Sequence, residues 1–359
     1  SVVGYAEAPY VEQTIVYAGE QSMPFSYDNT TEGMSEATRS FDAWDWTAGE
    51  VKTLSLMFYG SPGNTGQLYI KINSTKIAYD GDAGDIARPQ WHAWNIDLSS
   101  VSANLQKVTS LTIGVDGASA TGVIYIDAMR LYPQAGEFIT PVEPDAAGLV
   151  LRYEFEGNTN DSSGQGYHGT AIGSPLFVAG KQNQAIDLDG LEQTVRIAYS
   201  PALKPESEIT ISAWIRPDDI TFNQYCEIYR KEDGSARQLL SFQEWGTLLA
   251  FGLGIAGRYA ELDAPINPLN YTDGEWHLIT ATYDGAYKKI YSDGGLIGVA
   301  EAGGAIMTTG AADGFIGSSG GSLEWLDAGI DDFRFYSRAL SAGEILWLAG
   351  RTTTVHKPF

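Results

Sequence analysis

The sequence predicts an all-β protein made of two antiparallel β-sandwiches in tandem. Apolar residues alternate with polar ones in short runs, as in Leu68, Ile70 and Ile72, which is the period of a strand with one buried face. Turn residues separate these runs about every ten residues, a spacing typical of a sandwich. The composition agrees, with 41 glycines, 12% aromatic and only 19% charged residues, because a disordered chain would be poorer in aromatic residues and richer in charge.

The chain of 359 residues is long enough for two or three domains. Strand-like runs fill residues 1–133, which we expect to form the first domain. Residues 134–148 are rich in proline and small residues and lack periodicity, so we predict an interdomain linker. The strand pattern resumes over residues 149–350, the predicted second domain. Residues 351–359 carry no periodic signal and are expected to be a tail or an interaction strand.

The end of the second domain carries signals for a strand and a short helix. Phe333 and Phe335 alternate with polar residues, which predicts a late strand. Ser341 is followed three residues later by Glu344, a pattern that predicts a capping box at the start of a helix. We expect that helix over residues 342–349, with Gly350 as its C-terminal stop.

The formal net charge of −23, from 45 acidic and 22 basic residues, disfavours binding to nucleic acids or anionic membranes. No apolar run approaches the roughly 20 residues of a membrane span, so we expect no membrane insertion. The only cysteine, Cys226, excludes a disulfide within the chain and any paired-cysteine metal motif. An acidic chain rich in Asp and Gly does supply the oxygen ligands that calcium needs, although such a surface also serves solubility alone.

Six motifs follow one another in a fixed order in the second domain, namely LRYEFEGNTNDSSGQGYHGT (151–170), AIDLDGLEQTVRI (185–197), ITISAWIRPDD (209–219), DGEWHLITATYDG (273–285), IYSDGGLIG (290–298) and GIDDFRFYSRALSAGEI (329–345). With these motifs the domain resembles the laminin-G-like, concanavalin A-like jelly roll over nearly all of residues 147–350. This resemblance implies two packed sheets and, commonly, one structural calcium where the first strand of the domain meets the late Asp-Asp strand.

Calcium is the cofactor that this resemblance implies, and oxygen donors from distant parts of the chain suit it. The alternative is that Asp161 forms an Asx-type turn and that Asp331 pairs with Arg334 or Arg338. We expect calcium over that alternative, and the candidate ligands in the second domain are Glu156, Asp161, His168, Asp331 and Asp332.

The first domain resembles a jelly-roll module of large secreted proteins from planctomycete-like bacteria that looks like a carbohydrate-binding module. The matching motifs include GEQSMPFSYDNT (19–30), WHAWNIDLSSV (91–101) and YIDAMRLYP (125–133). Modules of this kind are expected to have a further strand before residue 4 that pairs with the last of these motifs, and the sequence lacks it. A sheet edge is therefore predicted to be open to a strand from another chain or to self-association, and the alternative is that the chain is a fragment. Asp127, in that motif, is a candidate metal ligand of the first domain.

The motifs of catalysis are missing from the sequence. Concanavalin A-like hydrolases usually carry Glu-x-Asp-x-x-Glu on one strand, and the nearest run here, Asp187 to Glu192, has the wrong order. The four histidines are scattered singly, and no HExxH, GxSxG or P-loop occurs. We therefore expect no enzyme activity.

Carbohydrate recognition needs exposed aromatic rings for stacking and nearby amides or guanidinium groups for hydroxyl groups. Our leading expectation is a non-catalytic protein, extracellular or at the cell surface, that is stabilised by calcium and binds carbohydrate or glycoprotein. The alternatives are a structural subunit assembled through β-edge contacts and an accessory fragment of a polysaccharide-degrading enzyme. The candidate ligand-binding residues are Trp91, Tyr225, Arg230, Gln243, Trp245, Arg258, Tyr259 and Trp325.

Overall fold

The computed structural model describes residues 1–359 and divides the chain into two compact units. The first unit comprises residues 1–140 together with 352–359, and the second comprises residues 141–351. The second unit is thus inserted into the first near its C-terminus. Nearly all regular structure is β, so the predicted fold class is confirmed. The single α-helix has seven residues, and no helix is long and apolar enough to cross a membrane.

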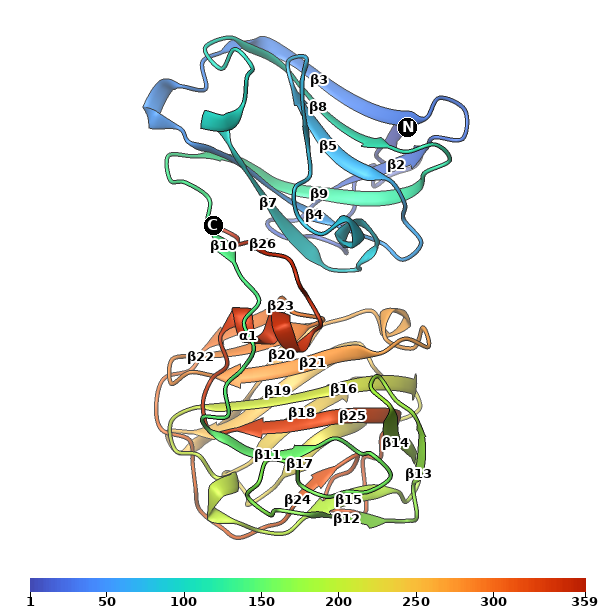
Figure 1. Ribbon diagram of the computed structural model, residues 1–359, viewed down its shortest axis with the longest axis vertical. Helices are drawn as coiled ribbons and strands as arrows, with labels where there is room; N and C mark the ends of the chain where they lie inside the picture. Colours follow the sequence, from blue (N-terminus) through green and yellow to red (C-terminus); the bar gives the residue numbers. More distant parts are fainter. The chain divides into compact units, whose positions relative to one another are not determined.

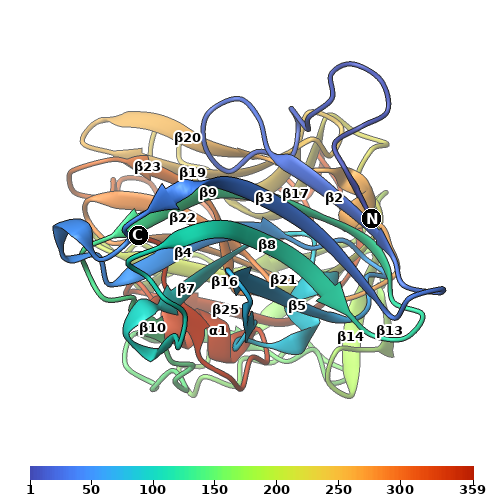
Figure 2. The same cartoon turned by 90° about the horizontal axis from the view of Figure 1, so that it is seen from above.

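The first unit is a sandwich of two antiparallel sheets (Figure 2). Phe25, Leu56 and Ile124 from one sheet pack against Ile70 and Val115 from the other, and none of them is exposed by more than a trace. The five-stranded sheet has the order β1 (Val2–Val3), β2 (Met23–Asp28), β9 (Thr121–Tyr132), β4 (Thr53–Tyr59) and β7 (Trp91–Asp97), and the four-stranded sheet has β3 (Met34–Trp44), β8 (Val108–Asp116), β5 (Gln67–Ile72) and β6 (Thr75–Ala78).

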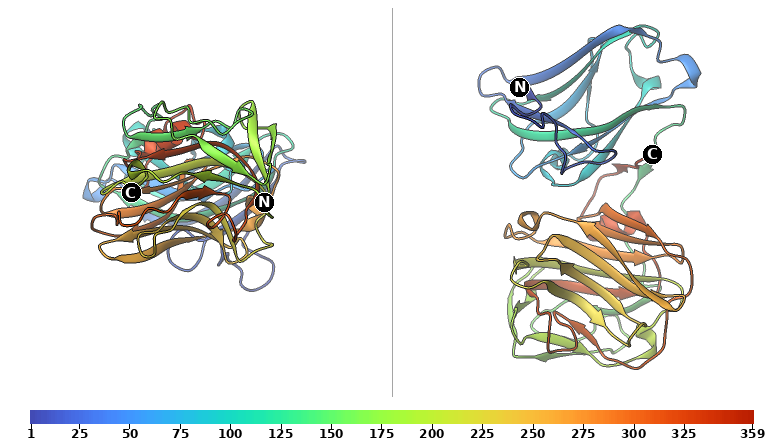
Figure 3. Two further views of the ribbon diagram at one scale, coloured as in Figure 1. Left: turned by 90° about the horizontal axis from the view of Figure 1, so that it is seen from below. Right: turned by 180° about the vertical axis from the view of Figure 1, so that it is seen from behind.

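The C-terminal residues belong to the first unit, because β26 (Val355–His356) pairs with β10 (Phe138–Ile139) (Figures 1 and 3). The Asn95 side-chain amide donates to the Lys357 carbonyl at 2.7 Å, and the ring of Phe359 stacks on Tyr132 with 4.0 Å between centroids. Both the expected linker and the expected tail therefore contribute a short strand to the first unit.

The second unit is a larger sandwich whose eight-stranded and seven-stranded sheets share one apolar core. The path of the eight-stranded sheet is β13 (Leu176–Ala179), β14 (Gln184–Asp189), β25 (Asp327–Tyr336), β16 (Ile209–Asp219), β21 (His277–Tyr283), β22 (Tyr287–Ser292) and β23 (Gly295–Glu301), with β11 (Leu149–Tyr153) paired to β25. The seven-stranded sheet has the order β12 (Gly169–Ile172), β15 (Thr194–Ile197), β24 (Gly314–Ile316), β17 (Tyr225–Lys231), β18 (Gln238–Gln243), β19 (Leu248–Ile255) and β20 (Arg258–Pro265).

Strand β25 is the predicted late strand, and it lies in the middle of the eight-stranded sheet. It pairs with β16 along one side and with β14 and β11 along the other. Ile330, Phe333 and Phe335 point into the core and are fully buried, as the alternation predicts. The first and last strands of the unit therefore lie side by side.

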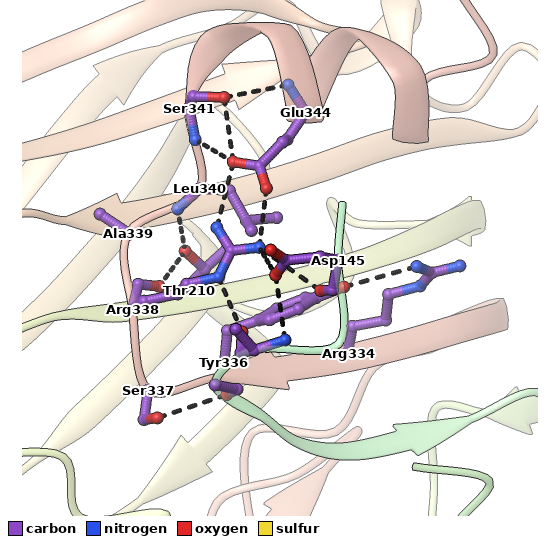
Figure 4. Close-up of polar contacts among 12 residues, drawn as sticks. Asp145, Thr210, Arg334, Tyr336, Ser337, Arg338, Ala339, Leu340, Ser341 and Glu344 are labelled. Carbon is purple, nitrogen blue, oxygen red and sulfur yellow. Dashed lines mark hydrogen bonds and ion pairs between the residues drawn. The ribbon is translucent and has the colours of Figure 1, made fainter. Parts of the chain in front are cut away.

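Helix α1 (Ala342–Leu348) closes the second unit, and its N-terminus has the predicted capping box. The Ser341 hydroxyl accepts from the Glu344 amide at 3.3 Å, and the Glu344 carboxylate accepts from the Ser341 amide at 2.8 Å (Figure 4). Arg338 donates to the same carboxylate at 2.7 Å. Ile345 and Leu348 pack with Trp214 on the outer side of the eight-stranded sheet, so the cap fixes a helix that covers an apolar face.

We predict that Ser341→Ala lowers the free energy of unfolding of the second unit by about 1 kcal/mol, the usual cost of losing an N-terminal cap. Chemical denaturation of the whole chain measures the change. Ser207→Ala is the control, because Ser207 is exposed and its hydroxyl makes no hydrogen bond. Equal stability of the two variants would contradict a role for the cap.

Candidate functional site

The outer face of the seven-stranded sheet carries polar and small side chains. Phe242 and Leu249 point into the core, so their neighbours along β18 and β19 point outward. In the middle of this face lie Ser241, Ala250 and Gly252, paired across β18, β19 and β20. These small residues form a floor that the neighbouring side chains cover, because Ser241 and Ala250 are fully buried.

Tyr259, Glu261 and Gln243 stand on this floor and bond with one another. The Tyr259 hydroxyl donates to one oxygen of Glu261 at 2.6 Å, and the Gln243 amide donates to the other at 3.0 Å. A Cβ atom on Gly252 would lie 2.0 Å from the Tyr259 hydroxyl. Only glycine lets the tyrosine cross the neighbouring strand this closely, so the position of the Tyr259 ring depends on Gly252.

Arg230 lies on the same face and joins three carboxylates at its border. Its guanidinium donates to Glu227 at 2.7 Å, to Glu232 at 2.8 Å and also to Glu324. Glu227 is fully buried, and this burial raises the pKa of its carboxyl well above the ordinary range although Arg230 opposes the shift. Arg230 is therefore engaged by the protein, and it holds the loop that contains Glu324 and Trp325 against β17.

The other predicted ligand-binding residues of the second unit fall in three places. Tyr225 is the strand partner of Gln243 and shares the outer face with it. Trp245 is 52% exposed in the turn before β19, whereas the exposed Arg258 is the first residue of β20 and pairs with Ile255 at the end of β19. Trp245 and Arg258 therefore lie at opposite ends of β19. Sequence reasoning missed Glu261, because its alternation with apolar residues along β20 looks the same as that of any solvated carboxylate.

The expected calcium ligands divide into separate groups. Asp161 forms the Asx-type turn that was the alternative, because its carboxylate accepts from the Ser163 amide at 2.9 Å, the Tyr167 amide at 3.0 Å and the Arg152 amide at 3.0 Å. His168 takes part in the same turn, since its Nδ1 accepts from the Asp161 amide at 3.0 Å. Asp161 and His168 thus both form hydrogen bonds with backbone amides of this turn and of β11.

Asp332 is neutralised by two arginines, since Arg334 and Arg152 each approach its carboxylate to 2.6 Å. Asp331 is buried without a basic partner and accepts from the Gln182 amide at 2.9 Å. Glu156 accepts from the Gln184 amide, so it faces the same loop as Asp331. No three acidic, histidine or cysteine side chains are placed to hold one ion, and the expected set does not fit a single calcium site.

The predicted candidates of the first unit lie on the outer face of its five-stranded sheet. Asp127 accepts from the amides of Tyr17 at 2.9 Å and Ala18 at 3.1 Å, so its carboxylate fixes a loop. Trp91 is partly exposed, whereas Trp94, three residues later, is buried in the core. Of these two tryptophans, only Trp91 is therefore accessible to a ligand.

Most of the second unit matches a known protein family. Residues 189–346 match the model of the concanavalin A-like lectin/glucanases superfamily, which has a laminin G-type jelly roll. Residues 189–346 therefore form a concanavalin A-like domain. No curated protein sequence matches the chain.

Among solved structures, the chain is similar to domain 4 of AbnA, a GH43 extracellular arabinanase from Geobacillus stearothermophilus, in complex with arabinotriose (22% identity, 57% of this chain and 100% of that chain, TM-score 0.46). It is also similar to the binding domain of Paraclostridial Mosquitocidal Protein 1 (18% identity, 56% and 52%, TM-score 0.46). A third is the binding domain of botulinum neurotoxin DC in complex with SialylT (14% identity, 57% and 52%, TM-score 0.44). The chain spans about half of each toxin chain.

An acidic cluster at the start of β25 makes the electrostatics of the concanavalin A-like domain sensitive to pH. Asp327 pairs in register with Asp189 on one side and Asp219 on the other. Burial and the charges of Asp218, Asp187 and these neighbours raise the pKa of Asp327 from 3.8 to about 6. Folding raises the pKa of Asp327, so the folded state favours the protonated carboxyl. The contribution of this group to the stability of the fold is therefore fully present below pH 3.8 and is lost as the pH rises through about 6.

We predict that Asp327→Asn raises the melting temperature at pH 7.5 and leaves it unchanged at pH 3.5, because the amide removes a charge that the cluster repels. Thermal unfolding at both pH values measures the effect. Glu301→Gln, which neutralises an exposed carboxylate in the same domain, is the control. A lower melting temperature of Asp327→Asn at pH 7.5 would contradict repulsion within the cluster.

Proposed function

We propose that this protein is a non-catalytic carbohydrate-binding protein whose concanavalin A-like domain binds glycan on the outer face of its seven-stranded sheet. The observation that supports this most is the group formed by Tyr259, Glu261 and Gln243 over the floor of Ser241, Ala250 and Gly252. An aromatic ring, an amide and a carboxylate are held together there by strands rather than by loops, and such rigid placement lowers the cost of binding.

The chemistry of these groups suits a sugar. A pyranose or furanose ring offers a C–H face that an aromatic ring can cover and a rim of hydroxyl groups that both donate and accept hydrogen bonds. The Gln243 side chain already donates to Ser241 at 3.1 Å and to Glu261 at 3.0 Å, so its carbonyl oxygen is the atom that can accept from a sugar hydroxyl. The Glu261 carboxylate accepts from Tyr259 and Gln243, and its remaining lone pairs can accept from a further hydroxyl. With a net charge of −23, the chain favours neutral glycans over polyanionic ones.

The absence of catalysis is part of this proposal. Glycoside hydrolysis requires one carboxyl as the acid and a second, free carboxylate across a cleft. On this face Glu227 is fully buried and bonded to Arg230, and Glu261 is occupied by Tyr259 and Gln243. Both carboxylates therefore serve better as structural or binding groups than as an acid and nucleophile.

An extracellular or cell-surface location and a role in adhesion also belong to the proposal, and the laminin G-like character of the second domain supports them. Assembly through a sheet edge remains the alternative function. It is favoured by one observation, namely that β2 pairs only with residues 121–126 of β9, so residues 127–132 have a strand partner on the β4 side alone. Carbohydrate binding has stronger support than assembly through a sheet edge, because the fold brings the side chains of Tyr259, Glu261 and Gln243 into contact.

We predict that a glycan array probed with the whole chain gives binding to neutral glycans, and that Gln243→Ala lowers the affinity for the best of them about tenfold. The loss corresponds to roughly 1.4 kcal/mol, the scale of one hydrogen-bonded polar group. Isothermal titration calorimetry measures the affinity. Tyr287→Ala, which removes an exposed tyrosine from the opposite sheet, is the control. Absence of binding at millimolar glycan would refute the proposal.

Calcium remains a proposal for a smaller set of residues, the carboxylates of Glu156 and Asp331 beside the loop 182–184. An ion bound at 100 times its Kd would stabilise the domain by about 2.7 kcal/mol, or roughly 5–10 °C for a domain of this size. We predict that calcium raises the melting temperature of the wild type and not that of Asp331→Asn. Glu301→Gln is the control, and a wild-type melting curve that calcium leaves unchanged would exclude the ion.

A further inference from the structure

We propose that the first unit carries a second glycan-binding surface, formed by the rings of Tyr5, Tyr17, Tyr59, Trp91 and Tyr125 on the outer face of its five-stranded sheet. We call this group the aromatic surface. It rests on observations in the first unit alone, so it stands or falls separately from the site proposed in the second domain.

Strand register builds the centre of the aromatic surface. Tyr59 in β4 is the direct partner of Trp91 in β7 and of Tyr125 in β9, so the three rings form one row across the sheet. The centroids of neighbouring rings lie 5.5 Å and 6.1 Å apart, with their planes at 68° and 74°. Their other neighbours in these strands, Phe58 and Ile126, point into the core, so the row faces outward.

The N-terminal segment adds the outer rings. The ring of Tyr17 approaches the ring of Trp91 edge-on, with 5.7 Å between centroids. Tyr5 lies beside Tyr125, and burial, Glu12 and Tyr125 together raise the pKa of the Tyr5 hydroxyl. Tyr17 and Tyr5 remain 41% and 40% exposed. A single exposed ring is ordinary, but rings that lie next to one another form a contiguous patch, and such patches often mark binding sites.

Two carboxylates hold this segment in place. Asp127 accepts from the amides of Tyr17 and Ala18, as described above, and Glu12 accepts from the amides of Gln13 and Ile15 at 3.0 Å and 3.2 Å. Glu12 also accepts a hydrogen bond from the Tyr5 hydroxyl. The rings are thus fixed before any ligand arrives, which reduces the entropy that binding must overcome.

The chemistry of the aromatic surface fits a glycan better than a protein. Every ring carries a hydroxyl or an indole N–H, so each offers an apolar face together with a polar edge. Steep angles between neighbouring planes give a stepped surface rather than the flat apolar area of a protein interface. Arg130 is exposed near Tyr17 and has no ion-pair partner, so its guanidinium is available to sugar hydroxyls. The strongly acidic chain again favours a neutral ligand.

Affinity gel electrophoresis of the whole chain tests the proposal, with galactomannan, arabinan and xyloglucan as neutral probes and polygalacturonate as the anionic probe. The experiment is run on Gln243→Ala/Tyr259→Ala, in which the face of the second domain is disabled. We expect at least one neutral polysaccharide still to retard this chain. Adding Tyr17→Ala should weaken that retardation about fivefold to tenfold, the scale of one lost aromatic contact.

Tyr17→Phe keeps the ring and should bind like the parent chain, and Tyr10→Ala removes an exposed tyrosine of the same segment that makes no ring contact. Because Tyr17 lies in a loop, its replacement spares the core, and an unchanged melting temperature confirms this. Loss of all retardation in Gln243→Ala/Tyr259→Ala would overturn the second surface while leaving the proposed function intact. Full binding by the chain with Tyr17→Ala would also overturn the second surface. The same holds if light scattering shows that the chain is a dimer and that Tyr17→Ala dissociates the dimer.

Discussion

The pairing of β25 with strands on both of its sides is the constraint on which the concanavalin A-like domain depends. Through β11 it joins the first strand of the domain to the last, and through β14 and β16 it supports the rest of the sheet. The buried carboxylate of Asp332 has to be neutralised at this junction, because an unpaired buried charge is strongly destabilising. Arg152 from β11 and Arg334 from β25 do this.

Both proposed binding faces follow from the same property of a sandwich. Each strand places every second side chain in the core. The remaining side chains point outward, so packing in the core does not restrict which residues they are. In the second domain the outward residues of β18, β19 and β20 give a low floor with Tyr259, Glu261 and Gln243 above it. In the first unit the outward residues of β4, β7 and β9 give a row of rings.

The sequence was sufficient for the features that depend on local pattern. Alternation placed Phe333 and Phe335 in the core, and the spacing of Ser341 and Glu344 identified the capping box. The sequence was insufficient for features in which a residue contacts a partner that is far away in the chain. The row of Tyr59, Trp91 and Tyr125 depends on the register of three strands, and the pairing of β10 with β26 joins residues more than 200 positions apart. The carboxylate of Asp127 fixes the loop of Tyr17, which is 110 positions away in the sequence, and no local signal indicates this contact.

The most direct test of two glycan-binding faces is an NMR titration of the whole chain, selectively labelled with 15N at tyrosine and tryptophan. The titrant is an oligosaccharide of whichever neutral polysaccharide binds best. Buried Trp94 and Tyr283 serve as internal references. The account predicts saturable shifts for the Trp91 indole and the Tyr259 amide, with both references unchanged. Absence of shifts at Trp91 and Tyr259, or shifts of the same size at Trp94 and Tyr283, would contradict it.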